Sequence, residues 1–111
     1  IIICMNMTKT EIEKHAPEVS RTLKLLAHPI RLKLLCALSM GEKTVTELVQ
    51  YVEASQSWVS QFLTRMRLEG LVDVRRDSKF AYYRIRDVRI LSIMEVIQTQ
   101  YCKPTRRKNH D

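Results

Sequence analysis

Two short segments of the sequence concentrate hydrogen-bonding groups and positive charge. The first carries hydroxyl, amide and guanidinium groups at six positions: Ser55, Gln56, Ser57, Ser60, Gln61 and Arg65. The second carries three cations close together: Arg75, Arg76 and Lys79. A carboxamide can pair with two atoms on the edge of an adenine, and a cation attracts phosphate. The same residue types also make an ordinary solvated surface, so composition alone leaves both interpretations open.

The cysteines and histidines are the residues that could bind a metal ion or undergo redox chemistry. His15, His28 and His110 are scattered along the chain, and a tetrahedral zinc site needs about four nitrogen or sulfur ligands. We therefore predict no metal site and no cofactor. Three cysteines in a reducing compartment do not indicate a disulfide framework. Taken alone, Cys36 is most simply a buried core residue, and Cys4 has no evident partner.

The chain is short, basic and without a long apolar run. Its 111 residues allow one domain, and its formal net charge of +7 favours a polyanionic partner such as nucleic acid. The apolar start, residues 1–5, is too short for a signal peptide, and no run reaches the ~18 apolar residues that span a bilayer. We therefore expect a cytoplasmic protein with no membrane partner. The only glycines, Gly41 and Gly70, form no phosphate-binding loop, and we expect no enzyme.

Capping residues and hydrophobic spacing predict five helices, over residues 8–27, 29–40, 44–52, 55–69 and 88–102. The expected caps at their starts are Thr8 or Thr10, Thr44, Ser55 and Asp87. Pro17 predicts a break or a kink in the first helix, and Gly41 is the expected C-cap of the second. Between residues 71 and 85 the apolar period changes to two around a polar turn, which predicts a β-hairpin.

The predicted order ααααββα resembles a winged helix-turn-helix, a mainly α fold with a β-hairpin wing. Three segments are similar to repressors of the ArsR/SmtB family: LKLLAHPIRLKLLCAL at 23–38, TVTELVQYVEASQSWVSQFLTRMRLEGLVDVRRD at 44–77 and FAYYRI at 80–85. The resemblance covers residues 19–102 and implies a dimeric transcriptional repressor that binds double-stranded operator DNA. An adaptor that uses this fold without binding an operator is the alternative.

The resemblance also assigns roles. The fourth helix would be the recognition helix, whose Ser and Gln side chains meet base edges in the major groove while Arg65 binds phosphate. The hairpin would be the wing, with Arg75, Arg76 and Lys79 on the DNA backbone. Residues 1–18 would form an arm and the start of the first helix, 19–102 the DNA-binding and dimerisation domain, and 103–111 a disordered basic tail. We expect the first and last helices to hold the homodimer, through the apolar stripe of Ile90, Met94, Ile97 and Tyr101.

Two cysteines match one branch of this family. Cys36 falls late in the second predicted helix and Cys102 at the end of the last, which is similar to the dithiol, sulfide- and redox-responsive branch. The resemblance implies that an oxidant or a reactive sulfur species joins Cys36 to Cys102 and that DNA is then released. A metal-responsive repressor of the same family, or a winged-helix regulator without a sensor, is the alternative.

Overall fold

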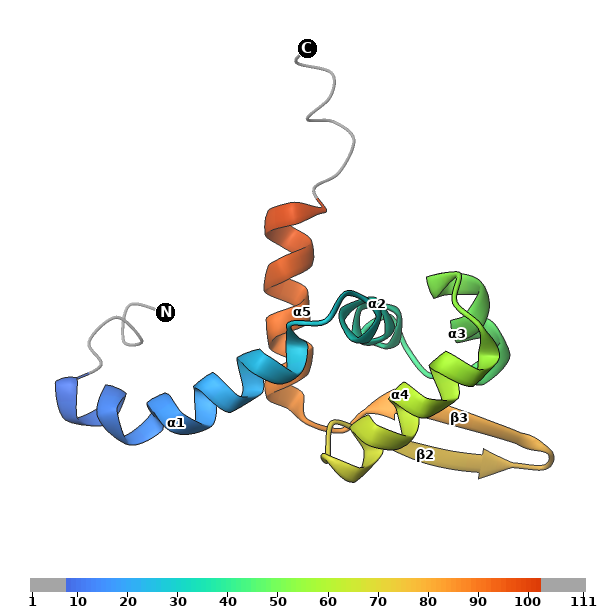
Figure 1. The fold of residues 1–111 in the computed structure, drawn as a ribbon, viewed down its shortest axis with the longest axis horizontal. Coiled ribbons are helices and arrows are strands. Elements are labelled where there is room, and N and C mark those ends of the chain that lie inside the picture. The colour runs from blue at the N-terminus through green and yellow to red at the C-terminus, as the bar shows by residue number, and fades with distance from the viewer. Residues whose placement is uncertain (1–7, 103–111) are drawn as a thin grey trace, which may run out of the picture.

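The computed structural model describes residues 8–102, so the predicted tail over 103–111, Cys4 and His110 lie outside the described residues. The described chain forms eight elements (Figure 1): α1 (Lys9–Leu26), α2 (Pro29–Leu38), β1 (Lys43–Thr44), α3 (Val45–Val52), α4 (Gln56–Leu68), β2 (Val72–Asp77), β3 (Phe80–Ile85) and α5 (Val88–Tyr101). The five helices and the hairpin confirm the predicted winged helix-turn-helix. Strand β1 was not predicted, because two residues are too few to show an alternating pattern.

Side-chain caps fix where the helices begin. The predicted caps are present at the starts of α1, α3, α4 and α5: Thr8, Thr44, Ser55 and Asp87. Helix α2 begins at Pro29, a position where the missing N–H costs nothing. The ring of His28 caps it, because its Nδ1 accepts a hydrogen bond from the Ile30 N–H at 3.2 Å. These contacts are local, which is why the sequence could predict most of them.

Two predicted boundaries are corrected by the structure. Helix α1 runs unbroken from Lys9 to Leu26, so Pro17 does not end it. An internal proline removes one backbone hydrogen bond, and the surrounding turns of α1 are exposed to water, which can take up the freed carbonyl. Helix α2 ends at Leu38 with Ser39 as its C-cap. Gly41 is therefore not the cap, and its φ of 136° lies in the turn that leads into β1.

The three strands form one antiparallel sheet in the order β1-β3-β2. Tyr82 on the central strand lies opposite Arg75 of β2 and opposite Thr44 of β1. Directly opposed residues point to the same face of a sheet, so these three side chains share one face. Val72 pairs with Ile85 on the other face, where Val72 is fully buried. One face of the sheet thus closes the core and the other faces solvent.

The core contradicts part of the predicted dimer stripe. Ile90 and Met94 are 0% exposed within the single chain, so they pack in its own core and cannot lie on a dimer surface. Of the other two members of the stripe, Tyr101 is exposed and Ile97 is half-buried, and Val88 and Val96 are further exposed apolar side chains of α5. One face of α5 packs in the core and another face carries exposed apolar residues. Spacing in the sequence does not separate these two sets, because both consist of apolar residues on the same helix.

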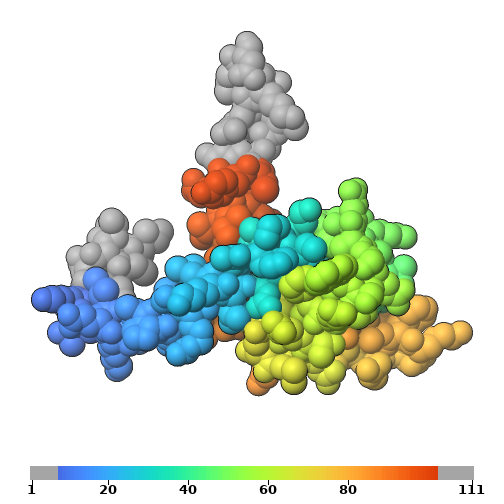
Figure 2. All heavy atoms as spheres, viewed as in Figure 1, coloured from blue at the N-terminus to red at the C-terminus, as the bar shows by residue number. Residues whose placement is uncertain are grey.

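Helices α1 and α5 project from the body that α2–α4 and the hairpin form (Figures 1 and 2). Along α1, three large apolar side chains are about half exposed: Ile12, Val19 and Leu23. Among residues 8–102, no helix combines the length and the hydrophobicity needed to cross a membrane.

Candidate nucleic-acid interface and thiol pair

A tight turn of three residues, 53–55, joins α3 to α4. Glu53 adopts the left-handed backbone conformation there, with φ of 55°. Ser55 then starts α4, because its hydroxyl oxygen accepts a hydrogen bond from the Trp58 N–H at 3.1 Å. One face of α4 is anchored in the core by three fully buried residues: Val59, Leu63 and Met66. The opposite face is left for contact with a partner.

A partly buried ion pair fixes the far end of α4. The Arg31 side chain, on the first turn of α2, is 8% exposed, and its Nη1 donates to Oε1 of Glu69 at 2.9 Å. Glu69 is the C-cap of α4. Because a buried guanidinium needs a partner, this contact ties the orientation of α4 to that of α2.

The exposed face of α4 carries a polar stripe. Ser57, Gln61 and Arg65 recur every four residues and are all exposed, so they lie along one side of the helix. Thr64 is exposed on the same side. Sequence reasoning missed Thr64, although its spacing of three residues from Gln61 could have indicated it.

The remaining predicted α4 residues lie beside this stripe. Gln56 is exposed in the first turn, Ser60 is half-buried, and the hydroxyl of Ser55 is engaged as the cap. The structure therefore places the predicted base-contacting residues within two turns of one helix end, with different degrees of access.

Aromatic rings flank the polar stripe. Trp58 stacks on Phe62 with ring centroids 5.8 Å apart, and Phe62 contacts the ring of His28 at 4.7 Å. Trp58 remains 55% exposed. Together with Gln61 and Arg65 these rings border a groove of about 710 Å³ along α4.

The wing carries cations in two different situations. Arg76 and Lys79 are exposed near the end of the hairpin, and neither forms an ion pair within residues 8–102. Arg75 is engaged, because its Nη2 and Nε donate to the two carboxylate oxygens of Glu42 at 2.8 and 3.3 Å. Its guanidinium carbon also lies 4.7 Å from the centroid of the Tyr82 ring. This hydrogen bonding with Arg75 lowers the pKa of Glu42.

The structure places Cys36, one of the two predicted thiols, at the contact between α2 and α5. Cys36 is half-buried, with its Sγ 3.8 Å from Sδ of Met94 on α5, and Cys102 is exposed just after the end of α5. Gln98 connects the two regions. Its side-chain Nε2 donates to the Ser39 hydroxyl at 2.7 Å, and its backbone carbonyl accepts a hydrogen bond from the Cys102 N–H at 2.9 Å. The Ser39 hydroxyl in turn donates to the Cys36 carbonyl at 2.6 Å.

Three effects act on the acidity of Cys36. Burial raises the pKa of its thiol, the nearby charge of Cys102 raises it further, and a hydrogen bond with Gln98 lowers it. Within residues 8–102, no three His, Cys, Asp or Glu side chains are grouped as metal ligands.

Comparison with known proteins relates this architecture to a family. Residues 28–74 match the family described as "Bacterial regulatory protein, arsR family". The chain is 38% identical over 97 residues to the biofilm growth-associated repressor of Xylella fastidiosa, covering 87% of this chain and 85% of the relative. It belongs to the ArsR family. It is also 33% identical to the transcriptional activator HlyU of Vibrio cholerae, over 87% of this chain and 90% of HlyU.

Solved structures of related proteins share the fold. The crystal structure of the transcriptional repressor BigR from Xylella fastidiosa matches with a TM-score of 0.81 and 38% identity, over 88% of this chain and 100% of BigR. A homodimeric winged helix-turn-helix DNA-binding domain from Mycobacterium bovis matches with a TM-score of 0.66 and 26% identity, over 85% of this chain and 87% of that domain. These likenesses place the chain in the BigR- and HlyU-like branch and make it a DNA-binding regulator rather than an enzyme.

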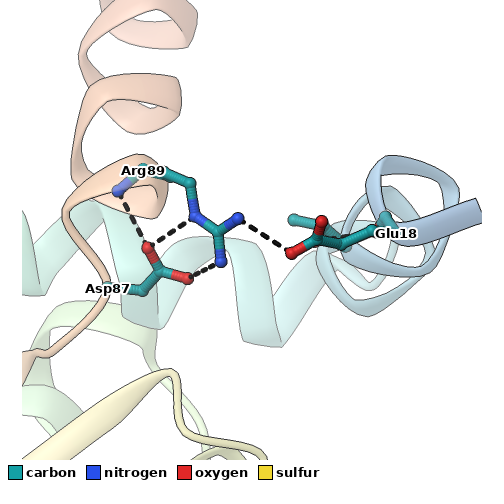
Figure 3. A network of polar contacts seen from close by, with 4 residues as sticks. Glu18, Asp87 and Arg89 are labelled. Atoms are coloured by element: carbon teal, nitrogen blue, oxygen red, sulfur yellow. Dashed lines mark hydrogen bonds and ion pairs between the residues drawn. The ribbon is translucent and has the colours of Figure 1, made fainter. Parts of the chain in front are cut away.

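In this ArsR-family protein, a clasp of three charged residues links the projecting helix α1 to the start of α5 (Figure 3). Arg89 donates to both carboxylate oxygens of Asp87 at 3.1 and 2.9 Å, and to Oε2 of Glu18 on α1 at 3.0 Å. Hydrogen bonding with Arg89 lowers the pKa of both carboxylates. The clasp was not predicted, because Glu18 and Arg89 are far apart in the sequence.

Proposed function

We propose that this protein is a transcriptional repressor that binds operator DNA as a homodimer through α4 and the wing. The polar stripe on the exposed face of α4 carries the proposal, since short polar side chains on a helix beside a basic hairpin suit a major groove with its flanking phosphates. The relative from Xylella fastidiosa is named a repressor, and the Mycobacterium bovis domain is described as homodimeric.

The polar residues of α4 and the wing then bind different parts of the DNA. The residues proposed to meet base edges are Gln56, Ser57, Ser60, Gln61 and Thr64. Arg65, one turn beyond Gln61, and the exposed wing cations Arg76 and Lys79 neutralise phosphates. Ser55 caps α4, and its hydroxyl hydrogen remains available for a phosphate oxygen.

We further propose that bridging Cys36 to Cys102 releases the DNA. The proposal is supported by the position of Cys36 against Met94 of α5 and by Gln98, which contacts Ser39 near Cys36 through its side chain and Cys102 through its backbone carbonyl. Cys102 is exposed and reacts first, and Cys36, whose pKa is raised by burial, closes the bridge.

The chemistry balances with either effector class. With hydrogen peroxide, the Cys102 thiolate attacks one oxygen, forms a sulfenic acid and releases hydroxide, and the Cys36 thiolate then displaces the sulfenic hydroxyl. Two thiols lose two protons and two electrons, and one peroxide becomes two waters. With an organic persulfide, Cys102 takes the outer sulfur and expels a thiolate. Cys36 then attacks the inner sulfur of the new Cys102 persulfide and expels hydrosulfide.

A bridge at this position can act on α4. A disulfide needs Cα atoms within about 7 Å, so a closed bridge constrains the end of α5 against α2. Helix α2 holds α4 through Arg31 and Glu69. A dimer must present its two recognition helices about one DNA turn apart, and a small shift therefore weakens both half-site contacts together.

The test compares reduced and oxidised protein on DNA from upstream of its own gene, in a Cys4→Ser background that removes the third thiol. The reduced protein should bind, and peroxide or an organic persulfide should weaken binding at least about tenfold. Cys36→Ser and Cys102→Ser should each bind like the reduced protein and fail to respond, while intact mass shows a loss of about 2 Da per bridged chain. Equal binding in both states would refute the sensing proposal alone, and no binding by reduced protein would refute the repressor proposal.

A further inference from the structure

Arg75 differs from Arg76 and Lys79 because its guanidinium already binds a carboxylate of the same chain, that of Glu42. Its side chain lies on the solvent face of the sheet, over Tyr82 of the central strand, and reaches Glu42 just before β1. One guanidinium therefore spans the sheet from β2, across β3, to the segment that precedes β1. A second carboxylate, that of Asp77, lies 3.6 Å from its Nη1.

The geometry leaves this guanidinium little capacity for DNA. Two of its nitrogens donate to the two oxygens of Glu42, and its flat face covers an aromatic ring. A guanidinium offers five N–H donors in a fixed fork, and here the edge formed by Nε and Nη2 is turned to Glu42 while Nη1 lies near Asp77. An exposed single ion pair contributes little, but a two-point contact with a stacked ring is better defined.

The place of Glu42 shows what the contact joins. Glu42 lies two residues before Thr44, the N-cap of α3, so it belongs to the start of the helix-turn-helix. Arg75 belongs to the hairpin, which extends from the body as the wing (Figure 1). Strand β1 pairs with β3 at only two positions, Lys43 with Tyr83 and Thr44 with Tyr82. Because only these two pairs join β1 to β3, side-chain contacts must help to set the angle between the hairpin and the segment that leads into α3.

We propose that Arg75 is a positioning residue for DNA binding. Through Glu42 and Tyr82 it sets the angle of the wing against α3 and α4, so that Arg76 and Lys79 meet the phosphates while α4 occupies the groove. The inference rests on the proposed use of the wing in DNA binding.

Paired substitutions at neighbouring positions test the assignment, with binding measured over a range of salt concentrations. Arg75→Lys keeps the charge but loses the two-point contact with Glu42, so affinity should fall about threefold to tenfold with an unchanged salt slope. Arg76→Lys should bind like the natural protein. Arg76→Gln should weaken binding and reduce the slope by about 0.9, as expected for one lost phosphate contact.

Glu42→Gln gives the sharpest contrast. Removing a negative charge near DNA tightens binding if Glu42 only competes with phosphate for Arg75, and weakens it about as much as Arg75→Lys if the pair positions the wing. Tyr82→Leu, which alters no charge, should cause a similar loss, and thermal unfolding of each variant verifies that it is folded. Natural affinity in Arg75→Lys, a reduced slope in that variant, or tighter binding by Glu42→Gln would overturn the inference. No effect of Arg76→Gln would instead refute wing contact with DNA, and the inference with it.

Discussion

At the scale of single residues, side chains of one type take different roles because their partners differ. Arg75 and Arg76 are adjacent in the sequence, yet Glu42 holds the first and the second has no ion-pair partner within residues 8–102. Cys36 is half-buried against Met94, whereas Cys102 is exposed. The residue type predicts which reactions or contacts an arginine or a cysteine can make. The neighbouring groups in the fold determine which of these it makes.

Gln61 and Arg76 should affect DNA binding in different ways. Gln61→Ala removes a side chain proposed to pair with a base edge, so it should cost roughly 1–3 kcal/mol on the operator and much less on unrelated DNA. Arg76→Ala should weaken binding to all sequences about equally, because phosphate contacts carry no sequence information. Binding to an operator and to a scrambled duplex measures both. A change in sequence preference in Arg76→Ala but not in Gln61→Ala would reverse the two roles.

Gln98 should control how fast the thiol bridge closes. Its hydrogen bond lowers the pKa of Cys36, so Gln98→Leu should raise that pKa and leave less thiolate at neutral pH. Closure should then be about threefold to tenfold slower. In the natural protein the pKa of Cys36 is raised by burial, so the closure rate should increase about tenfold per pH unit across neutral and mildly alkaline pH. Acid-quenched mass spectrometry measures the rate, with Gln100→Leu, an exposed site on the same helix, as the control.

At the scale of elements, local signals were predictable and contacts between elements were not. Thr44 and Ser55 cap α3 and α4 as their sequence context predicts, because capping depends on residues within one turn. Strand β1 exists only through its pairing with β3, and the partner of Arg31 is 38 positions away. No spacing rule indicates such a partner. The polar stripe on α4 was predictable as a set, but its separation into exposed and half-buried members required the neighbouring helices.

The ion pair between α2 and α4 should show an asymmetry in stability. Glu69→Ala leaves the guanidinium of Arg31 poorly exposed and without its carboxylate, which should lower the free energy of unfolding by about 1–3 kcal/mol. Arg31→Met replaces the buried charge with an apolar chain of similar length and leaves Glu69 at the surface, so it should cost less. Urea denaturation of both variants measures the difference. A larger loss in Arg31→Met would mean that packing of the arginine stem, and not its charge, joins the two helices.

At the scale of the whole molecule, α1 and α5 leave the body as two projecting helices (Figure 2). Both helices carry exposed apolar side chains. The clasp of Glu18, Asp87 and Arg89 links α1 to the start of α5 at the surface. Half-exposed apolar residues along a projecting helix are costly to leave in water. Their arrangement favours a second copy of the chain as the partner, and it transfers the expected dimer contact from the buried Ile90 and Met94 to the outer faces of these helices.

Leu23→Asp should therefore break the homodimer and, with it, operator binding. Leu23 is 54% exposed on α1 in the single chain, so an aspartate there is tolerated by the monomer but would be buried in the proposed interface. Losing one apolar contact of about 2 kcal/mol and burying a charge should raise the dimer dissociation constant at least about 100-fold.

Met40→Asp is the matched control, because Met40 is 57% exposed but lies on neither α1 nor α5. Sedimentation should show a monomer for Leu23→Asp and a dimer for Met40→Asp. Since one half-site contact is then lost, affinity for the operator should fall steeply in the first variant only. A Leu23→Asp protein that sediments as a dimer and binds the operator normally would place the interface elsewhere.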